Sequence, residues 1–469
     1  MPDRFSEELL LTNRTGGRLY REYAQHLPII DFHCHLLPRE IRENRVFSDL
    51  GEIWLGRDHY KWRAMRAFGI DEKYITGDAD YHGKYLAFAK ILPELIGNPL
   101  YIWCALELKR YFDIDEPLSA ANAEDIYRRT RDAIAREGIT PRWCMERSNV
   151  EIVCTTDDPI DPLEHHLAFR EDGSARPRVL PAFRPDKSLY CEKAHFPGYV
   201  GELAEAAGLP IAGFADLIAA LERRLQFFKT FGTAVSDHGI EEFVWREAAP
   251  EEVDGIFKKA RSGARPTGEE IAKYRSAFLA ALGGLYHRHG FVMQLHIGTY
   301  QDANRRGVRE VGAARGFDCA DDSTSVKSVG GLLNRLNEAG TLPKTLLYPL
   351  DPGKMETFAV LAGGFCGGGE RGLVQLGAPW WFNDQTYGIR RQFEAAGSLY
   401  PPALSVGMIT DSRSFFSYPR HELYRRVLCD WLGSLVERGE YFSGEGALKA
   451  IIENMCHGNA KAYFGFGGR

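Results

Sequence analysis

Residues 28–35 read Pro28-Ile-Ile-Asp31-Phe-His33-Cys-His35, a short apolar run that ends in two histidines. Alternate residues of a strand point to the same side, so we expect His33 and His35 to face one way together. Two neutral imidazoles at that separation can chelate one divalent ion, and this ligand type suits zinc, iron or manganese. The alternative is two polar residues at the start of a loop. The position directly after an apolar strand favours the metal site.

Seven further apolar runs follow, and most are continuous, as is typical of parallel strands covered on both faces. Helix-patterned segments separate them, including residues 323–339 and 418–438. Eight strand–helix repeats predict an α/β fold, specifically a (β/α)8 TIM barrel. The eight candidate strands are residues 28–35, 150–156, 178–183, 233–237, 291–297, 345–350, 373–378 and 404–410.

The 469 residues of the chain exceed the length of a minimal barrel, which needs about 250. The largest excess is a helix-patterned segment at about 37–147, between the first and second strands. Further helical excess lies at about 186–230 and 240–288. No linker rich in proline, glycine and serine bounds these segments, so we expect a single barrel domain over residues 1–469 with helical insertions.

The composition narrows the class of protein. The chain is 44% hydrophobic and 12% aromatic, as in globular proteins, and its formal net charge of -6 gives no indication of nucleic-acid binding. No run approaches the ~20 apolar residues of a membrane span, and the first residues lack a signal-peptide core. Nine scattered cysteines without metal-ribbon spacing are typical of a reducing compartment. We therefore expect a cytoplasmic enzyme with no membrane or nucleic-acid partner.

The last candidate strand ends in Thr410-Asp411-Ser-Arg413. In a closed barrel the eighth strand neighbours the first, so Asp411 is expected beside His33 and His35. A carboxylate there can ligate the metal, act as the proton-transfer base, or do both in turn. The alternative is that Asp411 and Arg413 form a structural ion pair or a helix cap.

Three other strand ends carry candidate site residues. His296 ends the fifth strand. We favour a catalytic or metal-binding role for it over that of a buried histidine with only structural hydrogen bonds. Asp237 ends the fourth strand, where it binds substrate hydroxyls, supports the metal or simply caps a helix. Arg184 follows the third strand, and its guanidinium fork suits a substrate carboxylate better than a plain surface role.

The first insertion concentrates acid–base and aromatic groups in Asp58-His59-Tyr60-Lys61-Trp62-Arg63. The plain interpretation is an amphipathic helix with core aromatics. After the seventh strand, Trp380-Trp381 is suited to stacking on a sugar face, although tryptophans are usually core residues.

His33-Cys-His35 with Asp411 resembles the amidohydrolase superfamily, whose barrels hold metal through a first-strand His-x-His and a last-strand Asp. A closer resemblance is to uronate isomerases (glucuronate isomerases), and it covers about residues 5–465. Five uncommon blocks match that family in order and spacing: Asp58–Met65, Thr155–Asp161, Val235–His238, Trp380–Asp384 and Thr410–Ser414.

The resemblance implies a barrel of the metal-dependent hydrolase type and an aldose–ketose isomerase. It implies interconversion of D-glucuronate with D-fructuronate, and of D-galacturonate with D-tagaturonate. The implied metal ligands are His33, His35 and Asp411, holding one divalent ion for which zinc is favoured over iron or manganese. The implied catalytic residues are Asp411, Tyr60, Arg413 and His296, and the implied substrate-binding residues are Arg184, His59, Asp237 and Trp381.

One position departs from the family pattern: Gln301 stands where an arginine is usual. If that arginine contacts substrate in relatives, Arg305 or Arg306 is a candidate replacement here. The departure bears on substrate preference more than on the type of reaction.

We favour an enediol route over a hydride shift, because Asp411 can serve as a single base that moves a proton from C2 to C1. Arg184 then holds the C6 carboxylate, and Tyr60 or a water carries the proton between O1 and O2. The main rival is a mononuclear hydrolase, since residues 345–350 offer no histidine for a binuclear one. A catalytically inactive sugar-acid sensor is the third class. The expected partner is a hexuronate, and the helical insertions leave room for a homo-oligomer.

Overall fold

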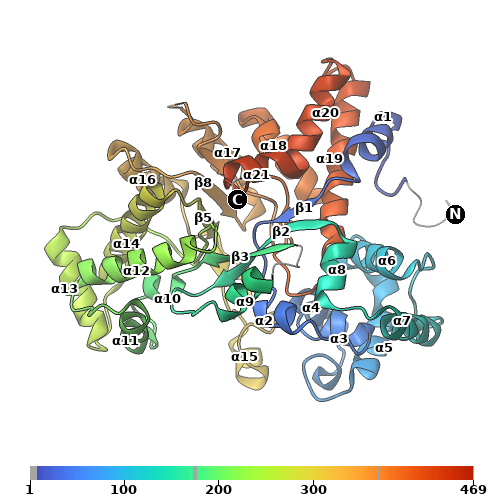
Figure 1. The fold of residues 1–469 in the computed structure, drawn as a ribbon, viewed down its shortest axis with the longest axis horizontal. Coiled ribbons are helices and arrows are strands. Elements are labelled where there is room, and N and C mark those ends of the chain that lie inside the picture. Colours follow the sequence, from blue (N-terminus) through green and yellow to red (C-terminus); the bar gives the residue numbers. More distant parts are fainter. Residues whose placement is uncertain (1–7, 173–176, 368, 468–469) are drawn as a thin grey trace.

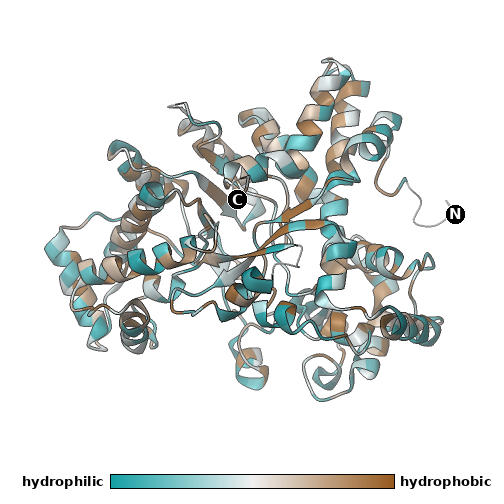
Figure 2. Cartoon of the chain, viewed as in Figure 1, coloured by the Kyte–Doolittle hydropathy of each residue, from teal (hydrophilic) through white to brown (hydrophobic). Residues whose placement is uncertain are grey.

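The computed structural model describes residues 8–172, 177–367 and 369–467. Short strands lie at the centre of the molecule, and helices surround them on the outside (Figure 1). Figure 2 shows the central strands as mainly apolar and the outer helices as a mixture of polar and apolar residues. The strands are β1 (Ile29–Asp31), β2 (Val150–Asp157), β3 (Arg178–Phe183), β4 (His238–Ile240), β5 (Met293–Ile297), β6 (Thr299–Tyr300), β7 (Cys319–Ala320), β8 (Thr345–Pro349) and β9 (Val374–Leu376).

The central strands are parallel and follow one another around a ring. One sheet has the order β1-β2-β3 and the next β4-β5-β8-β9. A single parallel bridge from Phe183 to Ser236 links the first sheet to the segment before β4, and a bridge from Val235 to Val292 extends the pairing of β4 with β5. The ring closes at the first strand, where the Asp411 N–H donates to the His33 carbonyl at 3.2 Å. The predicted α/β barrel is thus confirmed.

Two predicted strands differ from the structure. The fourth was predicted at 233–237, but its regular part, β4, begins at His238 and only isolated bridges precede it. The eighth, predicted at 404–410, forms no regular strand. Within this run Gly407 has φ +92°, and the Thr410 N–H donates to the Asp31 side chain at 2.8 Å. The backbone of this segment therefore does not make the regular series of hydrogen bonds that defines a β-strand.

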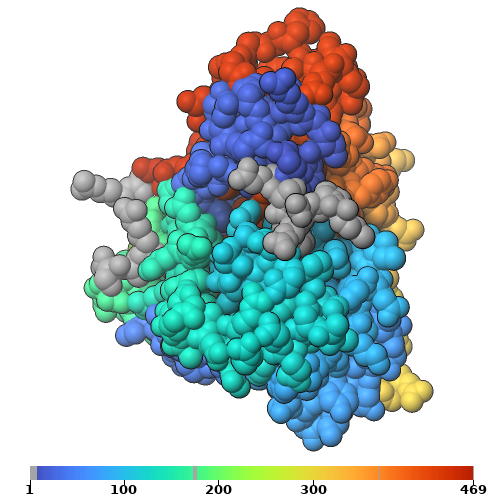
Figure 3. Space-filling model, turned by 90° about the vertical axis from the view of Figure 1, so that its right-hand side faces the viewer, coloured from blue at the N-terminus to red at the C-terminus, as the bar shows by residue number. Residues whose placement is uncertain are grey.

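The segment between β1 and β2 is helical, as expected for residues 37–147. Figure 3 shows this insertion as a broad blue-green face beside the helices of the C-terminal part. Its helices are α2 (Pro38–Glu43), α3 (Leu50–Leu55), α4 (His59–Ala67), η2 (Glu72–Tyr74), α5 (Tyr81–Ile91), η3 (Leu92–Glu94), α6 (Pro99–Phe112), α7 (Ala123–Glu137) and α8 (Pro141–Arg147).

The predicted excess at 186–230 and 240–288 is helical too. It comprises α10 (Asp186–Leu189), α11 (Phe196–Ala207), α12 (Phe214–Lys229), α13 (Pro250–Arg261) and α14 (Gly268–His289). The remaining helices are α1 (Arg14–Leu19), η1 (Tyr20–Ala24), α9 (Glu164–Asp172), α15 (Arg305–Val311), α16 (Val326–Glu338), η4 (Pro352–Lys354), α17 (Met355–Gly364), α18 (Thr386–Leu399), η5 (Pro402–Leu404), α19 (Pro419–Glu437), α20 (Glu445–Glu453), η6 (Asn454–Gly458) and α21 (Asn459–Tyr463). None of the helices in the described part of the chain has the length and apolarity of a membrane span.

An apolar cluster fills the ring and keeps the strand ends in place. It includes Ile30, Ile152, Leu180 and Leu346, each at most 4% exposed and each from a different ring position. Burial of such side chains contributes roughly 1.5–3 kcal/mol each. The cluster therefore provides a rigid support for polar groups at the carboxyl ends of the strands.

Candidate functional site

His33, His35 and Asp411 meet where the first strand adjoins the last ring position. The Nε2 atoms of His33 and His35 lie 3.0 Å and 3.2 Å from the same Asp411 Oδ1. Asp411 has φ +49°, a region that non-glycine residues seldom occupy and that clusters at functional sites. The predicted convergence of these three side chains is present in the fold.

A second cluster adjoins the first through His33. Asp237 is fully buried, and its Oδ1 lies 2.6 Å from His296 Nδ1. Its Oδ2 accepts a hydrogen bond from Arg184 Nη1 at 2.9 Å and lies 3.5 Å from His33 Nδ1. Both oxygens of Asp237 are thus engaged with protein groups, which favours the expected supporting role over direct binding of a sugar hydroxyl.

The protonation of these groups suits a cation. Burial opposes ionisation of Asp411, but hydrogen bonds from His33 and His35 hold its pKa well below the usual range. Asp237 is likewise kept well below its usual pKa against burial, chiefly by Arg184. Burial lowers the pKa of His296 to about 4, so this imidazole is neutral at pH 7. Burial also lowers the pKa of His35, whereas Asp237 and Asp411 raise the pKa of His33 against the effect of burial. A deprotonated imidazole beside an ionised carboxylate is the form that binds a divalent metal.

Two sets of three side chains in the described part of the chain can each hold a metal ion. One set is His33, His35 and Asp411, and the other is His33, Asp237 and His296; the ligand atoms within each lie within 4.8 Å of one another. His33 Nδ1 and His296 Nε2 are buried without a hydrogen-bond partner. Buried polar atoms are rarely left unsatisfied, so these nitrogens fit a site built for an additional group.

The insertion supplies an aromatic wall to the site. Asp58 caps α4, accepting from the Tyr60 N–H at 2.9 Å, and so places His59 and Tyr60 in the first turn. The His59 ring lies 5.4 Å from the Trp381 ring, which comes from the loop after β9. Burial, reinforced by nearby Arg413, lowers the pKa of His59 to about 3. His59 is therefore a neutral hydrogen-bonding group here.

The Tyr60 hydroxyl is already engaged. It donates to Asp384 Oδ1 at 2.9 Å and accepts from the Phe382 N–H at 2.9 Å. Asp384 in turn pairs with the buried Arg420, whose Nη1 lies 3.2 Å from Oδ2. No sequence pattern singled out Asp384 or Arg420, although Asp384 ends one of the uncommon blocks. Only the fold shows that they adjoin Tyr60.

Arg184 is held rather than free. Its Nε donates to Asp186 Oδ2 at 2.7 Å, and its Nη1 donates to Asp237. The guanidinium lies over Gly239, where an added Cβ would come within 2.3 Å of Nη2. The side chain is 22% exposed. A fixed orientation with remaining N–H groups suits the recognition of a carboxylate.

The segment that carries β6, α15 and β7 contains Gln301 and is contacted by Arg413. Arg413 Nη1 donates to the Ala314 carbonyl at 3.2 Å. Gln301 is exposed, as are Arg305 and Arg306, and Arg306 pairs with Glu310 at 2.8 Å. In this structure the predicted replacements for the missing arginine point to solvent.

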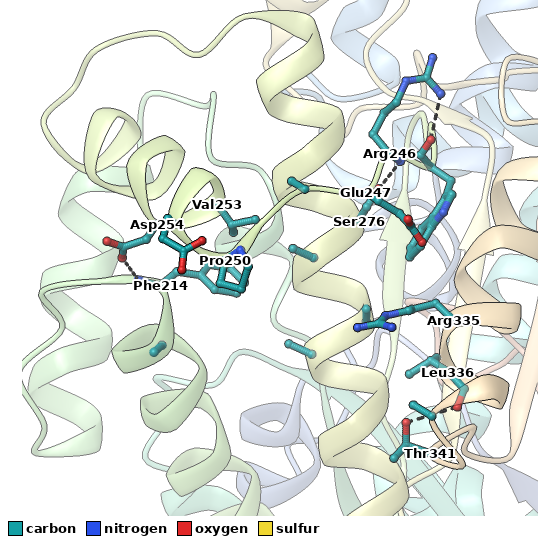
Figure 4. A pocket seen from close by; sticks show the side chains of 18 residues that line it. Phe214, Arg246, Glu247, Pro250, Val253, Asp254, Ser276, Arg335, Leu336 and Thr341 are labelled. Atoms are coloured by element: carbon teal, nitrogen blue, oxygen red, sulfur yellow. Dashed lines mark hydrogen bonds between the residues drawn. The ribbon is translucent and has the colours of Figure 1, made fainter.

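Several cavities in the described part of the chain lie apart from His33, His35, Asp237, His296 and Asp411. One of about 150 Å³ is lined partly by Arg413 and by residues of α2 and α3, beside the site. A larger groove of about 760 Å³ lies between α13, α14 and α16 (Figure 4). Polar contacts on its walls, such as Asp254 to the Phe214 N–H, are internal to the protein. None of the predicted site residues lines this groove.

Sequence comparison matches the chain to known proteins over nearly its whole length. The glucuronate isomerase family model matches residues 1–464. A uronate isomerase from Caldicellulosiruptor bescii is 46% identical over 98% of this chain and 99% of its own. A uronate isomerase from Marinomonas sp. is 45% identical over 99% and 100%.

Structural comparison agrees. The crystal structure of a uronate isomerase from Thermotoga maritima superposes with a TM-score of 0.92 at 33% identity, covering 98% of this chain and 99% of that one. A glucuronate isomerase from Caulobacter crescentus gives 0.91 at 26% identity, covering 99% and 98%. A metal-dependent hydrolase from Lactobacillus casei shares the fold alone, at 14% identity and a TM-score of 0.54. The chain, which brings His33, His35 and Asp411 together at the carboxyl end of its barrel, belongs to the glucuronate (uronate) isomerase family.

Proposed function

We propose that the protein is an aldose–ketose isomerase that interconverts D-glucuronate and D-fructuronate, and also D-galacturonate and D-tagaturonate. The observation that carries this proposal is the convergence of His33, His35 and Asp411 at the carboxyl end of the barrel. Membership of the family supports the choice of reaction, and Arg184 supports an anionic substrate.

One divalent ion, with zinc favoured over iron or manganese, fits this donor set. Two imidazoles and a carboxylate are common ligands of these metals, and His33, His35 and Asp411 would hold the ion. When bound, it supplies positive charge that stabilises negative charge on substrate oxygen. The His296 ring lies 4.5 Å from the His33 ring, and its unpartnered Nε2 offers a further neutral nitrogen beside this site.

Asp411 is proposed as the base. It would remove the proton from C2 of the open-chain aldehyde and return it to C1, giving the ketose through an enediol. Its low pKa keeps the carboxylate ionised, which is the form that a base requires. Arg413, also near the Asp411 carboxylate, would stabilise oxyanion charge in the enediolate.

The remaining residues bind and orient the sugar. Arg184 would hold the C6 carboxylate through its uncommitted N–H groups, which fixes the register of the chain. His59 and Trp381 would form one wall against the sugar. Asp237 would hold Arg184 and His296 in place through its two carboxylate oxygens. Tyr60 would contact a sugar hydroxyl during the proton transfer between O1 and O2.

The proposal extends to the location, domain organisation and partners of the protein. We place the protein in the cytoplasm, as one barrel domain with helical insertions, binding a hexuronate and no nucleic acid, with room for a homo-oligomer. All nine cysteines are unpaired, in keeping with a reducing compartment.

Proton NMR of the purified, metal-replete protein with each hexuronate tests the reaction. Accumulation of the matching ketose is the expected result. Hydrolysis of a sugar lactone without any ketose would favour the mononuclear hydrolase instead, and tight uronate binding without turnover would favour the sensor.

A further inference from the structure

The side chain of Asp384 connects three segments that carry predicted site residues. Its Oδ1 accepts from Tyr60 on α4, and Oδ2 faces Arg420 on α19. Arg420 Nη1 also donates to the Thr410 carbonyl at 2.9 Å, immediately before Asp411. Asp384 itself follows the loop that bears Trp381. The buried pair of Asp384 and Arg420 thus joins the insertion, this loop and the base.

The surrounding protein holds Asp384 and Arg420 in fixed positions. Asp384 is 1% exposed and Arg420 2% exposed. The Arg420 guanidinium lies over the Trp103 ring at 3.9 Å from its centroid, which fixes its plane. Removing one partner of such a buried pair leaves an uncompensated charge, so the arrangement is strongly held.

This arrangement fixes the polarity of the Tyr60 hydroxyl. A phenol has one proton and two lone pairs. The proton is directed to Asp384, and one lone pair accepts from the Phe382 N–H. What remains toward a ligand is a lone pair, which is an acceptor.

We propose that Asp384 is a positioning residue that makes Tyr60 a hydrogen-bond acceptor for a substrate hydroxyl, through the contacts Tyr60–Asp384 and Asp384–Arg420. The inference rests on the proposed function and deepens it. It gives Tyr60 a defined part in the reaction: the phenol oxygen accepts a hydrogen bond from a sugar hydroxyl. If that proton is transferred to the phenol oxygen, the phenol's own proton moves to the Asp384 carboxylate, so that no charge forms on the phenol.

Asp384→Asn tests this directly because it is nearly isosteric. Arg420 can only donate, so the amide oxygen would turn to Arg420 and the amide N–H₂ to Tyr60. Tyr60 would then receive two N–H groups, and its proton would be free to point into the site. The polarity of the hydroxyl would be reversed without removing it.

The experiment is a double-mutant cycle of Asp384→Asn and Tyr60→Phe, with kcat and KM measured for D-glucuronate. Each single variant is expected to lower kcat by about tenfold or more. The double variant is expected to be no slower than the slower single variant, because both changes act through one hydroxyl. Asp430→Asn is the matched control: Asp430 is a fully buried carboxylate that pairs with Arg390 and accepts from Thr12 Oγ1 at 2.8 Å. This control should lose stability but keep kcat and KM.

Multiplicative effects in the double variant would overturn the inference, as would a normal kcat in Asp384→Asn. If Asp384→Asn does not fold, Asp384→Glu replaces it, since its carboxylate still pairs with Arg420 but is displaced from Tyr60; the same coupling is expected. Failure of the wild type to form ketose would overturn the proposed function itself, and that result needs no variant.

Discussion

His33 Nε2 lies 3.0 Å from Asp411 Oδ1, although 378 residues separate the two in sequence. The contact exists because the barrel closes its last position onto its first. It joins one proposed metal ligand to the proposed base, so both should depend on the same local geometry.

Replacement of Asp411 by asparagine should abolish most of the activity. The amide keeps the shape of the side chain but cannot take the C2 proton, so kcat should fall by about 10² to 10⁴. The measurement is ketose formation by NMR with folding checked by circular dichroism. Near-normal turnover in Asp411→Asn would remove this residue from the role of base.

Metal content should depend on the proposed ligands. Elemental analysis should find about one divalent ion per chain, and His35→Asn should lose most of it. Removal of the ion by a chelator should lower the melting temperature, because a metal that binds only the folded state stabilises it. His166→Asn is the control, since this buried histidine bonds Thr155 Oγ1 at 2.9 Å outside the metal-ligand sets. Equal metal loss in both variants would contradict the ligand assignment.

Gly239→Ala should weaken substrate binding. An added Cβ would come within 2.3 Å of Arg184 Nη2 and must displace that guanidinium. KM should rise by about tenfold or more, since a charge-assisted hydrogen bond to carboxylate contributes roughly 1.5–3 kcal/mol. Gly284→Ala on α14 meets nothing within 4 Å and serves as control. An unchanged KM in Gly239→Ala would argue against Arg184 as the carboxylate-binding group.

Glu107 predicts a pH dependence of stability away from the chemistry. Burial raises its pKa from 4.5 to about 7 despite the nearby Lys61. Between these values the folded state holds a proton that the unfolded state has lost, so the free energy of unfolding falls as pH rises. Glu107→Gln, which mimics the protonated acid, should lose this fall, worth up to about 3 kcal/mol.

Urea unfolding at pH 5 and pH 8 measures the effect. The difference between the two pH values should shrink in Glu107→Gln and stay as in the wild type in the exposed control Glu356→Gln. Identical pH profiles in all three proteins would contradict this account of Glu107.

The sequence predicted the strands best where side-chain pattern alone decides structure. The run 178–183 became β3 with the same ends, because its solid apolar character requires burial on both faces. The run 404–410 is also largely apolar but forms no ladder, because Gly407 is left-handed and the side chain of Asp31 takes the Thr410 N–H. Such a loss depends on a residue that lies 379 positions away in sequence.

In the candidate site, too, features set by local pattern could be predicted and contacts between distant residues could not. His33, His35 and Asp411 were predictable from strand periodicity and barrel closure together. The partner of Tyr60 was not, because Asp384 lies 324 residues from Tyr60 and no local spacing relates them. Whether a hydroxyl donates or accepts a hydrogen bond is likewise set by its contacts in the fold, and no sequence pattern predicts it.

The central claim is that this protein moves a proton between C2 and C1 of a hexuronate, and NMR in D₂O tests it most directly. Metal-replete protein should convert D-glucuronate to D-fructuronate with solvent deuterium incorporated at C1, and D-galacturonate to D-tagaturonate in the same way. No ketose from either sugar would contradict the claim.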